Sequence, residues 1–134
     1  MLRMLTLLAA LVLLSSTAFS ADYATVDEAR AMALKAADYL KVNGPEKAFA
    51  AFEAKDAAFH DRDLYVWVQN SKGVMVSHGT NPGLIGKSVL DLRDVDGKPF
   101  NLEVQAVKDS GWVDYKWQNP RPRQWSRSAP LSPE

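Results

Sequence analysis

The chain has 134 residues, with 16 basic and 16 acidic side chains and no cysteine. This length supports one domain, and the balanced charge argues against nucleic acid or an anionic membrane surface as a partner. The lack of cysteine excludes disulfides, thiol chemistry and thiolate metal sites, so the fold must be held by its core alone.

The first twenty residues, MLRMLTLLAALVLLSSTAFS, have the pattern of a secretory signal. Arg3 supplies an early positive charge, an apolar run of about ten residues follows, and the small residues Ala18 and Ser20 precede the expected cleavage point. A membrane-spanning helix would need roughly twenty apolar residues. We therefore predict a signal peptide over residues 1–20 and a periplasmic or secreted mature protein.

Two helical patterns follow the expected cleavage point. Thr25 and Glu28 form a capping box, in which each side chain accepts a hydrogen bond from the other residue's backbone N–H. Apolar side chains then recur at spacings of three and four until Asn43-Gly44, a helix stop. Pro45 suits the first turn of a new helix. We predict a long helix followed by a short one, PEKAFAAFEAK.

The next segment, DLYVWVQNSKGVMVSHG, predicts a β-hairpin, because its first strand alternates aliphatic side chains with larger ones. The two faces of that strand are Leu64, Val66 and Val68 against Tyr65, Trp67 and Gln69. Residues 70–73 form the turn, and a second strand begins at Val74. Both faces are partly apolar, so we expect the long helix to cover the aliphatic face and the irregular region 79–100 to cover the aromatic face.

A short helix and a third strand follow this irregular region. Residues 101–107 have helical spacing, and GWVDYKW alternates again, with Trp112 and Asp114 on one face and Tyr115 on the other. The last stretch, RPRQWSRSAPLSPE, is rich in proline, arginine and serine without periodicity. We therefore expect residues 121–134 to be a disordered tail.

The segment YVWVQNSKGVMVSHGTNPGLIGKSVLDLRDVDGKPF, followed by GWVDYKWQNP, resembles the core of the single Cache domain family. The likeness extends from about Thr25 to Pro120 and rests on a long ordered string, not on one short motif. The resemblance implies an α+β fold in which a long N-terminal helix packs on an antiparallel PAS-like sheet, with a ligand pocket on the opposite face. It also implies an extracytoplasmic sensor for a small carboxylate, amine or amino acid, and no catalysis.

The chain departs from the family pattern after Pro120. The family continues through a turn into two further strands, whereas this chain shows no strand alternation there, as in a truncated or frame-shifted end. We therefore expect an incomplete Cache domain over residues 21–120, with the C-terminal strands missing. The third strand would then have an unpaired edge, which favours self-association.

Six side chains are candidate ligand contacts, because Tyr O–H and Trp N–H groups orient small polar ligands. The candidates are Tyr65, Trp67, His78, Trp112, Asp114 and Tyr115. For each aromatic residue the alternative is plain core packing. His78 donates a hydrogen bond to a ligand, carries a charge near neutral pH, or merely ends a strand. Asp114 binds a ligand amine or makes a structural hydrogen bond.

The remaining motifs point away from phosphate, metal and catalytic chemistry. GLIGK lacks the spacing of a P-loop, and we assign Lys87 to the solvated loop. DLRDVDG has alternating carboxylates, but the twelfth position of a calcium loop counted from Asp91 is Leu102 instead of Glu. Asp96-Gly97 is better explained as a turn. No serine or histidine lies in a recognised catalytic motif, so we predict no enzyme, no metal and no cofactor.

The leading hypothesis is an exported module that binds a small metabolite and acts in signal transduction through a membrane-bound partner. The alternative is a structural or interaction protein, or a non-functional fragment, that binds no ligand. The two hypotheses differ in whether a small molecule raises the melting temperature of the folded protein.

Overall fold

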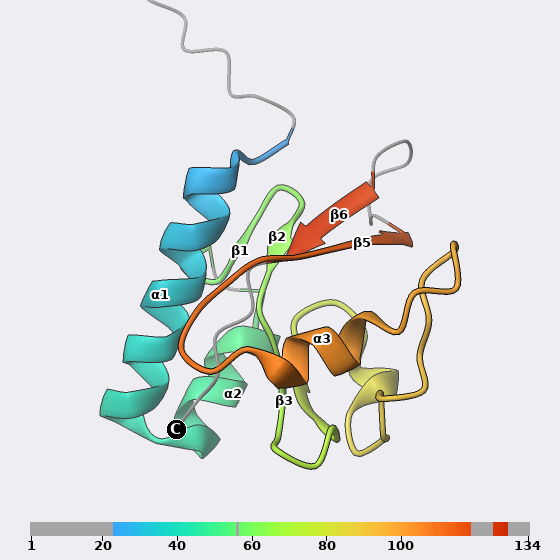
Figure 1. Ribbon diagram of the computed structural model, residues 1–134. Coiled ribbons are helices and arrows are strands. Elements are labelled where there is room, and N and C mark those ends of the chain that lie inside the picture. The colour runs from blue at the N-terminus through green and yellow to red at the C-terminus, as the bar shows by residue number, and fades with distance from the viewer. Residues whose placement is uncertain (1–22, 56, 119–124, 129–134) are drawn as a thin grey trace, which may run out of the picture.

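The computed structural model describes residues 23–55, 57–118 and 125–128; the predicted signal peptide lies outside them. In chain order the elements are α1 (Val26–Asn43), α2 (Pro45–Glu53), β1 (His60–Asp61), β2 (Leu64–Tyr65), β3 (Trp67–Gln69), β4 (Met75–His78), the 3-10 turn η1 (Pro82–Leu84), α3 (Phe100–Ala106), β5 (Val113–Gln118) and β6 (Trp125–Ser128). Figure 1 shows α1 and α2 at one side of the molecule and α3 with its preceding loop at the other. None of the helices in this described part is long and apolar enough to span a bilayer.

Helix α1 begins and ends where the sequence predicts. The Thr25 hydroxyl accepts from the Glu28 N–H at 3.2 Å, and the Glu28 carboxylate accepts from the Thr25 N–H at 2.7 Å, which completes the capping box. Gly44, with φ of 79°, ends the helix and donates to the Leu40 carbonyl. Pro45 then begins α2. The prediction of a long helix followed by a short one is confirmed.

The two helices pack on one face of the β3–β4 hairpin. The buried centre of this core is Ala36, Ala48, Phe52 and Phe59. The two phenylalanine rings meet edge to face with centroids 4.9 Å apart, a preferred geometry for aromatic pairs. Val66 and Val68 pack against the same core, as the alternation predicts. Tyr65 and Trp67 therefore point to the opposite face.

The first predicted strand is divided in two. β2 pairs with β1, a strand that the sequence pattern did not predict, and β3 pairs with β4 with a bulge between Val68 and Gln69. The β1–β2 turn holds Arg62 in a left-handed conformation, with φ of 54°. The Arg62 guanidinium contacts the Glu28 carboxylate at 2.7 Å and donates to the Tyr23 carbonyl at 3.2 Å. The β1–β2 turn therefore joins the β1–β2 strand pair to the N-terminal end of α1.

The irregular segment after β4 returns along the second edge of that strand. The Gly86 N–H donates to the Met75 carbonyl at 2.8 Å, and the Met75 N–H donates to the Lys87 carbonyl at 2.9 Å. Val74 and Ser88 form an isolated antiparallel bridge. β4 therefore lies between β3 and the returning chain, so residues without strand periodicity are still held by backbone hydrogen bonds.

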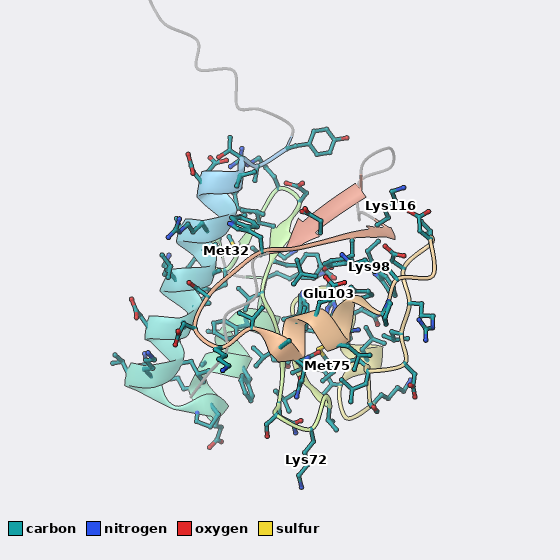
Figure 2. All side chains as sticks on the ribbon, viewed as in Figure 1. Met32, Lys72, Met75, Lys98, Glu103 and Lys116 are labelled. Atoms are coloured by element: carbon teal, nitrogen blue, oxygen red, sulfur yellow. The ribbon has the colours of Figure 1, made fainter. Side chains whose placement is uncertain are left out.

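A second core lies between α3 and β5. Its buried side chains are Phe100, Val113 and Tyr115, and the Phe100 and Tyr115 rings stack with centroids 4.1 Å apart. Lys98, just before α3, forms an ion pair with Glu103 at 3.0 Å, and Figure 2 shows these two side chains together. The predicted short helix and third strand are both confirmed.

β6 corrects the expectation for the C-terminal segment. Residues 125–128 pair antiparallel with β5, with Val113 opposite Ser128 and Asp114 opposite Arg127 (Figure 1). The prediction of disorder is therefore wrong for residues 125–128, and so is the prediction that β5 lacks a partner strand. Long-range backbone pairing makes this strand, and four residues carry too little local periodicity to predict it. Residues 121–124 and 129–134 of the predicted tail lie outside the described part.

Candidate functional site

A cavity lies on the face of the β3–β4 hairpin that carries Trp67, opposite the helices α1 and α2. Residues of β2, α3 and β5 also contribute to its wall. Its narrow interior measures about 20 Å³, and the depression around it encloses about 310 Å³ when the solvent at its mouth is included. An interior of this size holds roughly one water molecule. A ligand must therefore be small, and it must occupy the depression or displace side chains at the mouth.

The cavity brings together four of the six predicted side chains. These four are Tyr65, Trp67, His78 and Tyr115. Trp112 and Asp114 do not line it. Trp112 directly precedes β5, and Asp114 lies on the face of β5 opposite Tyr115, because alternate residues of a strand point to opposite faces. Tyr115 is buried, whereas Trp112 is 39% exposed and Asp114 is also exposed. One strand cannot present Trp112 and Asp114 on the same face as Tyr115, so the structure separates the predicted set.

Six further side chains line the cavity without having been predicted from the sequence. They are Met75, Leu84, Leu92, Phe100, Asn101 and Trp117. The alternation of β5 does carry a signal for Trp117, which shares a strand face with Tyr115. No periodicity identifies Leu84, Leu92 or Asn101, because the fold brings them in from a 3-10 turn, a loop and the first turn of a helix.

His78 is held as a neutral hydrogen-bond donor. Its Nδ1 accepts from the backbone N–H groups of Thr80 at 3.2 Å and Asn81 at 2.9 Å. An imidazole nitrogen that accepts hydrogen bonds carries no proton, so the proton of the neutral ring lies on Nε2. Burial also lowers the pKa of His78 to about 4. Of the roles left open by the sequence, this geometry supports the donor and contradicts a charge near neutral pH.

The loop HGTNPGLIGK builds the histidine site from its backbone. The Asn81 side chain accepts from the Gly83 N–H at 3.1 Å and so caps the 3-10 turn η1. Gly79 lies where a Cβ atom would be 3.1 Å from the Cβ of Tyr65 and 3.2 Å from the Phe52 carbonyl oxygen. A side chain at position 79 would therefore require these neighbours to move by a few tenths of an ångström.

Tyr65 lies beside His78 and keeps its hydroxyl proton. The two rings have centroids 5.2 Å apart. Burial raises the pKa of Tyr65, and a side-chain hydrogen bond with Thr80 opposes that shift. The phenol therefore stays neutral at physiological pH, and a hydroxyl can accept one hydrogen bond while it donates another. Tyr65 and His78 together offer two adjacent donors.

The described side chains that line the cavity include no Asp, Glu, Lys or Arg. Lys87 is exposed.

Asp94, from the calcium-like motif, accepts hydrogen bonds from the backbone N–H groups of Asp96 and Lys98 at 2.9 Å and of Lys116 at 3.0 Å. These hydrogen bonds lower the pKa of the Asp94 carboxyl, and the bond from Lys116 contributes most. The same bond joins the Asp94 loop to β5. Within the described residues, no cluster of three His, Cys, Asp or Glu could hold a metal ion.

The chain was compared with known families, proteins and structures. The family model described as "Single Cache domain 2" matches residues 7–128, and thus continues beyond Pro120. The methyl-accepting chemotaxis protein McpP of Pseudomonas putida KT2440 is 32% identical over 73 residues, which are 52% of this chain and 13% of that protein. The chain therefore spans about an eighth of this curated relative.

Two solved structures that match this chain are of chemotaxis proteins. A methyl-accepting chemotaxis protein from Vibrio parahaemolyticus RIMD 2210633 superposes with a TM-score of 0.62 at 18% identity, over 77% of this chain and 74% of that one. A structure described as a periplasmic sensor domain of a chemotaxis protein gives a TM-score of 0.48 at 25% identity, over 77% and 74% of the two chains. The Vibrio structure establishes the α+β architecture.

Proposed function

The chain belongs to the single Cache domain 2 family, and from this premise we propose that it is an exported sensor domain that binds a small carboxylate and signals through a membrane-bound partner. The name of the Pseudomonas relative, a chemotaxis protein, supports a signalling role. The signal-like pattern of residues 1–20 supports export. In this proposal the domain acts by binding and does not catalyse a reaction.

One observation carries the choice of ligand: several residues that line the cavity bear N–H or O–H groups, and none of the described lining side chains is acidic. The lining groups with an N–H or O–H are Tyr65, Trp67, His78, Asn101, Tyr115 and Trp117. A carboxylate only accepts hydrogen bonds. Bonds to an ionised acceptor are shorter and roughly twice as strong as neutral ones, which offsets part of the cost of removing the anion from water.

The same wall disfavours an amine. An ammonium group would be removed from water without a carboxylate partner, because no Asp or Glu of the described chain lines the cavity. The exposed position of Asp114, on the opposite face of β5, removes the acidic group that the sequence offered for an amine. Of the three ligand classes expected from the sequence, the geometry therefore favours a small carboxylate over an amine or an amino acid.

Calorimetric titration of the mature protein with sodium propionate and, separately, with propylamine tests this proposal. We expect binding of propionate alone. Trp67→Phe removes an N–H donor from the cavity and should weaken binding about 10- to 150-fold, the equivalent of one lost hydrogen bond to a charged group. Trp112→Phe, at an exposed position directly before β5, is the matched control and should bind as the unaltered protein does.

Two results would contradict the proposal. Binding of propylamine without propionate would assign the cavity to amines. A lack of any binding or thermal stabilisation across short carboxylates, amines and amino acids would favour the alternative, an interaction domain that takes no small ligand.

A further inference from the structure

Asn101 lines the cavity and carries a buried acceptor that no described residue satisfies. The residue lies in the first turn of α3, lines the cavity and is only 1% exposed. Its Nδ2 donates to the Val89 carbonyl at 2.8 Å. This bond distinguishes the two ends of the amide, because a carbonyl accepts from the nitrogen and not from the oxygen. Oδ1 is buried and has no hydrogen-bond partner among the described residues.

This position differs from those of the other unsatisfied buried atoms. Within the described residues these are Oε1 of Gln69 and Oγ of Ser77, and neither residue lines the cavity. Buried polar atoms in native proteins nearly always have a partner, so an exception calls for an explanation. Of the three residues, only Asn101 lines this cavity, so a ligand there could supply the missing partner of its Oδ1.

We propose that Asn101 Oδ1 accepts a hydrogen bond from a hydroxyl group adjacent to the ligand carboxylate, so that the cavity selects 2-hydroxy acids over simple acids of the same length. This inference rests on the proposed function, since the donors of the cavity bind the carboxylate. A hydroxyl suits the site better than an ammonium because a carboxamide oxygen is uncharged and no acidic side chain of the described residues lines the wall. Asn101 is thus a residue that determines specificity.

The test compares L-lactate with propionate, which differs from it by the hydroxyl group, in calorimetric titrations of the mature protein. We expect lactate to bind at least about tenfold more tightly, a difference of about 1.4 kcal/mol. In Asn101→Leu that preference should disappear while propionate still binds. Ser77→Ala is the matched control, because it removes another buried unsatisfied oxygen that does not line the cavity, and it should keep the preference. A purely structural role of Asn101 would weaken both acids equally and leave their ratio unchanged.

An NMR titration keeps the proposal testable if Asn101→Leu does not fold. In the unaltered protein, lactate should shift the side-chain NH₂ signals of Asn101 more than propionate does. Equal affinities for the two acids, or equal shifts, would overturn this inference and leave the proposed function standing. Tighter binding of L-alanine than of L-lactate would also overturn it, in favour of an ammonium. If neither acid binds, the proposed function fails and this inference fails with it.

Discussion

His78 makes the stability of the domain depend on pH. Its pKa is lowered by burial from 6.5 to about 4, so the unfolded chain takes up a proton at a higher pH than the folded protein does. Stability is therefore complete above pH 6.5 and decreases as the pH falls toward 4. We expect urea unfolding to show a loss of about 2 kcal/mol between pH 7.5 and 4.5, a value reduced for solvent that enters the cavity mouth.

The control for this prediction is His78→Gln, which removes the titrating ring and should flatten the profile over the same range. The carboxylates of Glu28 and Asp94 add a smaller loss in the same direction, because their pKa values are lowered in the folded protein, that of Glu28 to about 2, and the unfolded chain begins to protonate them as the pH falls to 4.5. This smaller loss should remain in His78→Gln. An unchanged pH profile in His78→Gln would show that this histidine is not the group responsible.

At the scale of residues, the sequence predicted which strand face a side chain occupies better than it predicted the protonation state of His78. Strand alternation placed Tyr65 and Trp67 opposite the helices, and this agrees with the structure. The same alternation could have excluded Trp112 and Asp114 from the set that contains Tyr115, because one strand face cannot hold all three. The neutral state of His78 could not be predicted, since two backbone N–H groups of a nonrepetitive loop determine its tautomer.

The turn between β3 and β4 depends on glycine at position 73. Gly73 has φ of 71°, and a Cβ atom there would lie 2.2 Å from Cγ of Leu90. Figure 2 shows the neighbouring Lys72 at the tip of this turn. We expect Gly73→Ala to lower the free energy of unfolding by about 3 kcal/mol, from left-handed backbone strain together with the clash.

Gly97→Ala is the matched variant for this turn. Gly97 also has a positive φ, 82°, but a Cβ atom there would have no atom of another described residue, its chain neighbours aside, within 4 Å. It should cost only the backbone strain, about 1 kcal/mol. Urea denaturation of both variants measures the difference, and equal losses would mean that contact with Leu90 contributes nothing.

Asp94 joins two elements through its carboxylate. Asp94→Ala would leave the N–H groups of Asp96, Lys98 and Lys116 without their acceptor. We expect a lower urea midpoint of unfolding, together with faster hydrogen exchange of the Lys116 amide. Asp91→Ala, at an exposed position of the same loop, should change neither quantity. Slow exchange at Lys116 in Asp94→Ala would contradict this role.

At the scale of elements, local signals predicted helices well and loops poorly. The capping box and Gly44 marked both ends of α1, because helix ends are determined by a few neighbouring residues. The return of residues 86–88 along β4 had no local signal, since it consists of backbone hydrogen bonds that any side chain permits. β6 was missed for the same reason.

Pairing of β6 with β5 should keep the molecule from associating with itself. The β5 backbone has the loop around Asp94 on one edge and β6 on the other. Removing residues 119–134 should expose an edge of β5, lower the melting temperature and produce oligomers, because unpaired strand edges recruit other strands. Removing only residues 129–134 is the control and should leave the protein monomeric. Light scattering at several concentrations distinguishes the two variants. A monomeric protein after removal of residues 119–134 would contradict the prediction.

At the scale of the whole molecule, the family and architecture could be inferred from one long string of residues, whereas the composition of the cavity could not. The string identified a Cache domain, and the family match confirms it. The cavity wall is assembled from β2, β3, β4, η1, α3 and β5, together with a loop. Only the folded chain shows that no described residue of this wall has a charged side chain. The proposed preference for a carboxylate rests on that assembly.

The most direct test of the central claim, that a small carboxylate binds the donors of this cavity, is an NMR titration of the tryptophan indole N–H signals with sodium propionate. The chain has four tryptophans, which give four indole signals. Trp67 and Trp117 line the cavity, and Trp112 is exposed directly before β5. The signals of Trp67 and Trp117 should shift together with one dissociation constant while that of Trp112 stays in place. A shift confined to Trp112, or no shift at saturating propionate, would contradict the claim.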